Sequence, residues 1–197
     1  MVDKQNLTRE TIVPFLAEIF ERNAAEEYLG ESVTIAEHML QGAQLAQEAG
    51  APDEVVAAAL LHDVGHFTHE FEPDAADHGI DTKHEEAGAR VIERFFPRIV
   101  VDCVRHHVDA KRYLCATNPK YFDRLSEASV HSLNLQGGPM SEDEAARFAK
   151  NPNLKDILRV RVWDEEGKIP GKETPGITDY MDLLQRVVDR HMGAAPA

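Results

Sequence analysis

The sequence has little cysteine and no long hydrophobic run. Only Cys103 and Cys115 occur among 197 residues, and they form neither a pairing pattern nor a CxxC motif, whereas 10 histidines favour metal chemistry. No apolar stretch approaches the roughly 20 residues that a membrane-spanning helix needs. The first six residues also lack the basic and then apolar profile of a signal peptide. We therefore expect a protein of the reducing cytoplasm that does not associate with a membrane.

Positive charge is also scarce. The chain carries 21 basic against 35 acidic residues, which gives a formal net charge of −14. Such a surface repels nucleic acid and anionic membranes, so we expect no nucleic-acid partner. An anionic substrate would have to meet a local basic pocket.

Strand patterns are missing as well. The sequence shows no convincing alternation of apolar and polar residues, no internal repeat and no low-complexity tract. With 43% hydrophobic residues, residues 1–197 predict one compact all-α helical bundle with a frayed tail from about 193 to 197. Helical spacing predicts helices over 9–22, 34–50, 52–63, 82–96, from 97 onward, 126–135, 142–150, 154–164 and 180–191. Three of these begin at a predicted capping box, formed by Thr34 and Glu37, Thr82 and Glu85, and Ser141 and Glu144. We expect 68–81, which is acidic and without an apolar face, to form a loop over the functional site.

The pair His62-Asp63 ends the most apolar of these helices. A buried carboxylate is costly unless a cation neutralises it, and a metal ion does so directly. Taken alone, the pair would as readily be an ion pair or a structural histidine. It is not alone, because His38, His84 and His107 lie at the start or on the apolar side of three other helices, as inner ligands of a helical metal site should.

Asp164 is the second candidate carboxylate. It follows the helix face of Ile157 and Val160, which should point it inward, although a surface position at the helix end is equally compatible with the spacing. Four imidazoles and two carboxylates suit iron or manganese better than a structural zinc held by thiolates. Asp63 is the carboxylate best placed to bridge two ions.

The order of these residues resembles the H…HD…D signature of the HD-domain superfamily of metal-dependent enzymes, which are helical bundles. His84 and His107 match the second-metal ligands of its dinuclear members, which include phosphohydrolases and mixed-valent diiron oxygenases. The superfamily alone does not choose between hydrolysis and oxygenation.

A more specific resemblance runs over nearly the whole chain. It is to the organophosphonate-degrading diiron oxygenases, which cleave 1-hydroxy-2-aminoethylphosphonate to glycine and phosphate, or its N-trimethyl form to glycine betaine. The matching segments are 28–31, 37–38, 62–66, 83–85, 107–114, 136–140 and 161–165.

This resemblance implies a mixed-valent centre of two iron ions with O₂ as co-substrate. One iron would be held by His38, His62 and Asp164, the other by His84 and His107, with Asp63 bridging. The resemblance also implies a catalytic and substrate-binding set: Tyr28 and Glu31 in a loop over the oxygen position, and His66, Lys111, Ser129 and Arg161 beside the substrate.

Spacing alone says less about the substrate side. Lys111 lies one helical turn beyond His107 and suits a phosphonate, although a solvated lysine would be ordinary there. Arg161 lies three residues before Asp164, which fits a substrate fork or a structural ion pair about equally. His66 follows His62 by four residues, so it would lie close to it if the helix persisted past Gly65, and we expect it beside the metal rather than as a ligand. Only the resemblance indicates that Ser129 binds substrate.

The small-molecule substrate remains open between a primary amine and a trimethylammonium. The acidic loop 67–81 departs from the glycine-forming enzymes and favours the methylated form. One alternative is a metal-dependent phosphohydrolase acting on a phosphate ester without oxygen. Another is a non-catalytic regulatory module, which should have lost metal ligands. The sequence predicts no oligomeric state.

Overall fold

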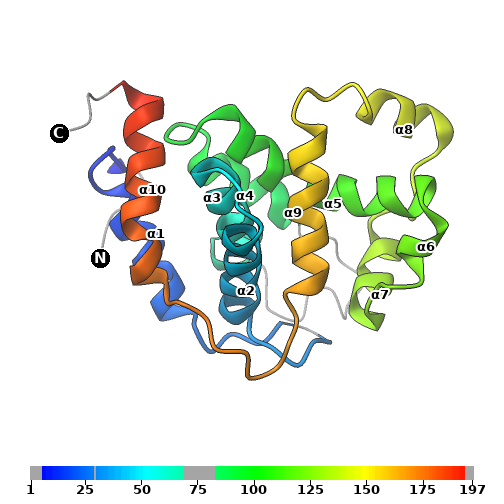
Figure 1. Ribbon diagram of the computed structural model, residues 1–197, viewed down its shortest axis with the longest axis horizontal. Coiled ribbons are helices and arrows are strands. Elements are labelled where there is room, and N and C mark those ends of the chain that lie inside the picture. The colour runs from blue at the N-terminus through cyan, green and yellow to red at the C-terminus, as the bar shows by residue number, and fades with distance from the viewer. Residues whose placement is uncertain (1–5, 29, 69–82, 194–197) are drawn as a thin grey trace.

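The computed structural model describes residues 6–28, 30–68 and 83–193, and within them the chain is all-α, as predicted (Figure 1). One isolated pair, Glu27 and Thr34, bridges in the antiparallel sense. The elements are α1 (Ile12–Arg22), α2 (Ile35–Glu48), α3 (Asp53–Leu61), the 3-10 helix η2 (Val64–Phe67), α4 (His84–Ile92), α5 (Arg98–Thr117), α6 (Pro119–Phe122), α7 (Glu127–Leu135), α8 (Glu142–Phe148), α9 (Leu154–Glu166) and α10 (Ile177–Met192).

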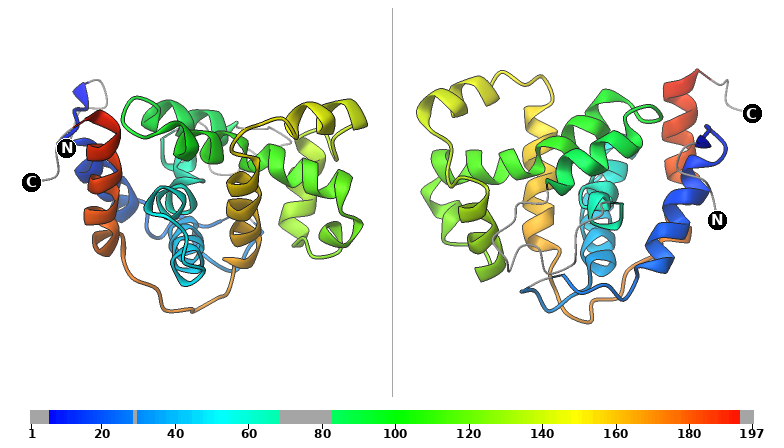
Figure 2. Two further views of the ribbon diagram at one scale, coloured as in Figure 1. Left: turned by 45° about the horizontal axis from the view of Figure 1, so that its top comes forward. Right: turned by 180° about the vertical axis from the view of Figure 1, so that it is seen from behind.

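Helix α3 forms the centre of the bundle. Every residue from Val55 to Leu61 is buried, because this helix is apolar on all sides. It packs against α2, α5, α9 and α10. The amphipathic α1 and α10 pair along one side, while α6, α7 and α8 lie together beyond α9 on the other (Figures 1 and 2). The carboxyl end of α3 thus lies in the middle of the molecule, and His62 and Asp63 directly follow it.

Two of the predicted capping boxes are confirmed. The Thr34 hydroxyl accepts a hydrogen bond from the Glu37 amide at 3.1 Å, and the Glu37 carboxylate accepts one from the Thr34 amide at 2.9 Å. Ser141 and Glu144 form the same arrangement before α8. The box predicted at Thr82 lies outside the described residues. Lys83 is the N-cap residue of α4 and lies in the left-handed region, with φ of 49°, and its side chain makes no capping hydrogen bond.

Several predicted boundaries were wrong. Helix α4 ends at Ile92 rather than at 96, and the chain then turns with the amides of Phe95 and Phe96 both bonded to the Ile92 carbonyl. Pro97 disfavours helical geometry only in Phe96, so it does not account for a helix end four residues earlier. The four-residue helix α6 was not predicted, since one turn is too short to show a periodic apolar face. Of the loop predicted over the site, 68–81, Thr68 alone lies within the described residues.

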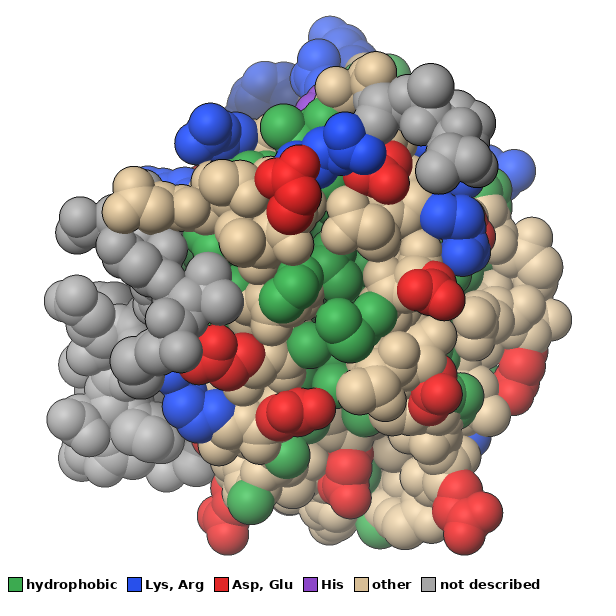
Figure 3. Space-filling view, turned by 90° about the vertical axis from the view of Figure 1, so that its left-hand side faces the viewer, with side chains coloured by type: hydrophobic (Ala, Val, Ile, Leu, Met, Phe, Trp, Pro, Cys, Tyr) green, Lys and Arg blue, Asp and Glu red, His purple; other side chains and the backbone are tan. Residues whose placement is uncertain are grey.

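The described helices include none that is long and apolar enough to cross a membrane. The face formed by α1 and α10 carries scattered acidic and basic side chains around a strip of apolar atoms (Figure 3). Acidic residues outnumber basic ones over the whole chain.

Candidate metal centre

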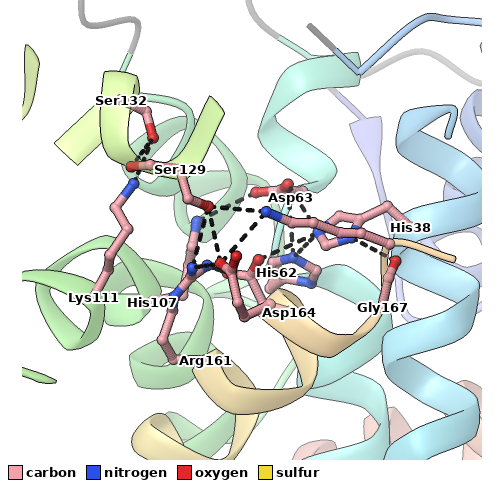
Figure 4. Close-up of polar contacts among 12 residues, drawn as sticks. His38, His62, Asp63, His107, Lys111, Ser129, Ser132, Arg161, Asp164 and Gly167 are labelled. Atoms are coloured by element: carbon pink, nitrogen blue, oxygen red, sulfur yellow. Dashed lines mark hydrogen bonds and ion pairs between the residues drawn. The ribbon is translucent and has the colours of Figure 1, made fainter. Parts of the chain in front are cut away.

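Five helices bring the predicted metal ligands to one point at the end of α3. His38 comes from the first turns of α2, and His62 and Asp63 directly follow α3. The other three come from the first turn of α4, the middle of α5 and the last turn of α9: His84, His107 and Asp164. All six are buried, with at most 9% of any residue exposed. Figure 4 labels five of them, all but His84, and shows these five gathered in one region.

Asp63 lies between two pairs of histidines. Its Oδ2 atom is 3.6 Å from the Nε2 atoms of both His38 and His62. Its Oδ1 atom is 3.2 Å from the Nε2 atoms of both His84 and His107. The ligand atoms therefore form two triads that share Asp63. The first triad is His38, His62 and Asp63, the second is Asp63, His84 and His107, and each is compact enough to hold one ion.

The histidines present their Nε2 atoms to these two positions. Within the pairs, Nε2 lies 2.9 Å from Nε2 for His38 and His62, and 3.0 Å for His84 and His107. Three of the Nδ1 atoms instead face backbone carbonyl oxygens at 2.8–3.0 Å: His38 faces Gly167, His62 faces Ala59 and His107 faces Val104. An Nδ1–H that donates to a carbonyl leaves the Nε2 lone pair free for a metal. Two such lone pairs about 3 Å apart repel each other unless a cation lies with them.

The carboxylates fit the same interpretation. Both oxygens of Asp63 and the Oδ1 atom of Asp164 are buried without a hydrogen-bond partner. Leaving buried carboxylate oxygens uncompensated costs several kcal/mol, which a bound cation removes. Asp164 Oδ1 lies 3.5 Å from His38 Nε2, so Asp164 can add a ligand to the triad of His38, His62 and Asp63. The centre is a metal site.

The pKa shifts of His62 and Asp63 suit metal ligands. Burial lowers the pKa of His62 to about 4, although the charge of Asp63 opposes this shift. His62 is therefore neutral at pH 7, as a metal ligand must be. Burial raises the pKa of Asp63, but the charge of His62 and contacts with His107 and His84 outweigh it and leave that pKa well below the usual range.

Lys111 lies beside the centre on α5, one turn beyond His107. It is 5% exposed, and its Nζ atom donates to the Ser132 hydroxyl on α7 at 2.6 Å (Figure 4). Burial lowers the pKa of Lys111 to about 7, with a further contribution from the charge of Arg161. Lys111 is therefore not a solvated lysine, and its charge changes near neutral pH.

Arg161 connects the centre to its surroundings. Its guanidinium donates to the Tyr121 hydroxyl at 2.6 Å and to the carboxylates of Asp164 and Glu165. Ser129 is buried nearby, 3.4 Å from Arg161 Nη2, and its hydroxyl donates to Glu165 at 2.9 Å. The structure thus contains the Arg–Asp pair that the spacing allowed, next to the groups that the resemblance assigns to a substrate.

Tyr28 covers the first triad. Its ring stacks on the His38 imidazole with the centroids 4.7 Å apart, and it meets His66 edge-on at 6.1 Å. Burial, followed by the charges of Asp63 and Asp164, raises the pKa of Tyr28 well above its usual value, so the phenol keeps its proton.

Glu31, three residues after Tyr28, ties this segment to the body of the protein. Its carboxylate accepts hydrogen bonds from the Ser126 hydroxyl at 2.6 Å and from Lys168 at 2.8 Å. Glu31 therefore lies on the same side of the centre as Ser129.

The helical continuation considered for His66 does not occur. Helix α3 ends at Leu61, and His66 belongs to η2. Its ring stacks on His84 at 4.2 Å, and its Nε2 atom lies 4.0 Å from Asp63 Oδ1. His66 therefore lies next to the second triad and not on the helix face of His62.

Comparison with known proteins identifies the family. The HD domain family matches residues 35–151. The glycine-betaine-forming (1-hydroxy-2-(trimethylamino)ethyl)phosphonate dioxygenase of Leisingera caerulea is 58% identical over 192 residues, which are 98% of each chain. The hydroxymethylphosphonate dioxygenase of Gimesia maris is 42% identical over 157 residues, which are 79% of this chain and 78% of the relative. The chain belongs to the HD-domain phosphonate dioxygenases.

As a phosphonate dioxygenase, the protein is an oxygenase. The HD domain match ends at residue 151, so Asp164 reaches the centre from outside the matched residues. Sequence reasoning missed three polar side chains around the centre: Tyr121, Ser132 and Lys168. Tyr121 and Ser132 carry no spacing signal. Lys168 follows Gly167, the C-cap of α9, and carries no spacing signal either.

Proposed function

We propose that the protein uses O₂ to cleave the C–P bond of 1-hydroxy-2-(trimethylamino)ethylphosphonate, giving glycine betaine and phosphate. The observation that carries this proposal is the 58% identity, over 98% of both chains, to an enzyme named for that reaction. In the overall balance, C1 loses its hydrogen and its phosphorus, the products gain two oxygen atoms, and one O₂ accepts the four electrons.

We further propose that the metals are two iron ions. His38, His62 and Asp164 would hold one ion, His84 and His107 the other, and Asp63 both. The nitrogen and oxygen ligand set favours iron, and the two triads around Asp63 support a pair of ions. The bound irons supply the O₂ activation and the redox chemistry.

The protein groups around the centre would bind and orient the substrate. Lys111 and Arg161 would meet the phosphonate with an ammonium and a planar guanidinium, and Ser129 would donate a hydroxyl hydrogen bond. His66, beside the second triad, would hydrogen-bond the substrate hydroxyl. Tyr28 and Glu31 would cover the oxygen position until substrate enters, which keeps water and stray oxidation out.

The decisive experiment compares three phosphonates with the iron-loaded protein, with and without O₂. The trimethylamino substrate, its primary-amine analogue and hydroxymethylphosphonate are each incubated, and phosphate and the organic acid are measured. We expect oxygen-dependent phosphate release and glycine betaine, fastest with the trimethylamino substrate. Release without oxygen would indicate the phosphohydrolase alternative, and no release from any of the three would reject the proposal.

A further inference from the structure

Lys168 contacts polar groups from three separate parts of the chain. Its Nζ atom donates to Glu31 Oε1 at 2.8 Å, to Ser129 Oγ at 2.9 Å and to Ser126 Oγ at 3.2 Å, and lies 3.4 Å from Glu165 Oε2. Its side chain is only 9% exposed. The charge of this lysine therefore acts inside the protein and not in solvent.

The backbone around Lys168 is held against α2. The Gly167 carbonyl faces His38 Nδ1 at 3.0 Å, and the amide and carbonyl of Ile169 bond the Gln41 side chain at 3.0 and 2.9 Å. A Cβ atom on Gly167 would lie 3.0–3.2 Å from three backbone atoms, which is tighter than ordinary contact, so glycine favours this close approach of the two segments. Lys168 thus extends from a fixed base next to a metal ligand.

The segment that carries Tyr28 and Glu31 makes local backbone bonds at its described residues. The Tyr28 amide donates to the Val33 carbonyl at 3.3 Å, and the Glu31 amide to the Tyr28 carbonyl at 2.8 Å. The Glu31 carboxylate bonds Lys168, and the same ammonium lies 5.9 Å from the centroid of the Tyr28 ring, within cation–π range. One ammonium therefore touches both side chains that cover the centre.

We propose that Lys168 is a positioning residue that holds the segment of Tyr28 and Glu31 over the metal centre. Removing its charge leaves Glu31 buried beside Glu165 without its cation, which costs far more than losing an exposed pair. The segment should then open more often, and Tyr28 should leave His38. This inference rests on the proposed function only for the role of Tyr28, which is to cover the oxygen position until substrate enters.

Hydrogen–deuterium exchange of the full-length protein, with its metal content measured, tests this directly without substrate. We expect Lys168→Met to speed exchange of the amides in 26–35 at least tenfold, with α1 and α10 unchanged. Lys168→Arg should restore most of the protection, since it keeps the charge. Lys155→Met, an exposed lysine of α9, is the matched control and should change nothing.

A double-mutant cycle separates this role from general destabilisation. Glu31→Gln alone and combined with Lys168→Met should speed exchange in 26–35 no more than Lys168→Met does, because both changes break one tie. Unchanged exchange in Lys168→Met, or additive effects of the two changes, would overturn the proposal. If Lys168→Met speeds exchange over the whole chain, the test becomes Glu31→Gln alone. Faster exchange confined to 26–35 in that variant supports the proposal, and unchanged exchange there rejects it. The readout needs no phosphonate, so it stands even if the proposed reaction fails.

Discussion

The motif His62-Asp63-Val64-Gly65-His66 contains a glycine whose reason becomes visible only in the fold. A Cβ atom on Gly65 would lie 1.8 Å from the His84 carbonyl oxygen and 2.8 Å from the Gly88 amide nitrogen. The backbones of η2 and α4 therefore touch at Gly65. Because the obstructing oxygen belongs to His84, a proposed metal ligand, Gly65→Ala is a direct test of how the second triad is placed.

The size of the effect follows from these distances. Ordinary contact begins near 3.4 Å, so α4 must recede by about 1.6 Å to admit the methyl group. His84 would move with it, away from Asp63 and His107, which now lie 3.2 and 3.0 Å from its Nε2 atom. Overpacking of this kind costs about 3 kcal/mol or more, which lowers Tm by roughly 6–12 °C for a chain of this length. A displacement above 1 Å also costs about 100-fold in rate.

The assay is metal content per chain together with Tm. We expect Gly65→Ala to retain about one metal ion, held by His38, His62 and Asp164, and to lose the one held with His84. Gly42→Ala is the matched control, because a Cβ atom there meets only the Ala59 carbonyl at 3.5 Å. Gly42→Ala should keep both ions, and its free energy of unfolding should rise by up to about 1 kcal/mol, because alanine has a higher helix propensity than glycine. If Gly65→Ala binds two ions with an unchanged Tm, the close approach does not position His84.

Asp63→Ala should lose both metal ions, measured by metal analysis after reconstitution, whereas two ions per chain would refute the bridging role. The pKa of Lys111 is about 7 and lies below its usual value, so the ammonium is charged below that pH and neutral above it. The kcat/KM for a phosphonate should therefore fall as pH rises through 7 in the free enzyme, and this fall should be absent in Lys111→Met. Arg161→Lys should lower kcat/KM about 100-fold, because an ammonium lacks the planar fork with which Arg161 contacts Asp164, Glu165 and the Tyr121 hydroxyl; activity within threefold of wild type would argue against this role.

The sequence predicted the helices that carry the centre better than it predicted their ends. Apolar spacing and the capping pair of Thr34 and Glu37 placed α2 correctly, and the apolar run before His62 identified the central helix. The break of α4 at Ile92 and the change to a 3-10 helix after Asp63 depend on tertiary contacts, which local propensity does not contain.

Side chains that act across elements were the hardest to predict. Histidines stand out in a sequence, and Asp164 could be proposed because it shares a face with apolar residues. Lys168 lies in a segment without periodicity, and its partners Glu31 and Ser129 are 137 and 39 residues away. No spacing rule connects such positions, so only the fold assigns them to one cluster.

The charges around the centre explain how an acidic protein can bind an anionic substrate. Among the described residues, the cluster holds three cations, Lys111, Arg161 and Lys168, against four carboxylates: Asp63, Asp164, Glu165 and Glu31. The side chains alone are therefore slightly negative. The two proposed metal ions would reverse that sign, because their charge exceeds the excess of carboxylates. A phosphonate dianion should then bind tightly only when both proposed metal positions are filled, and the metal pair rather than a basic patch would make the pocket attractive to the substrate.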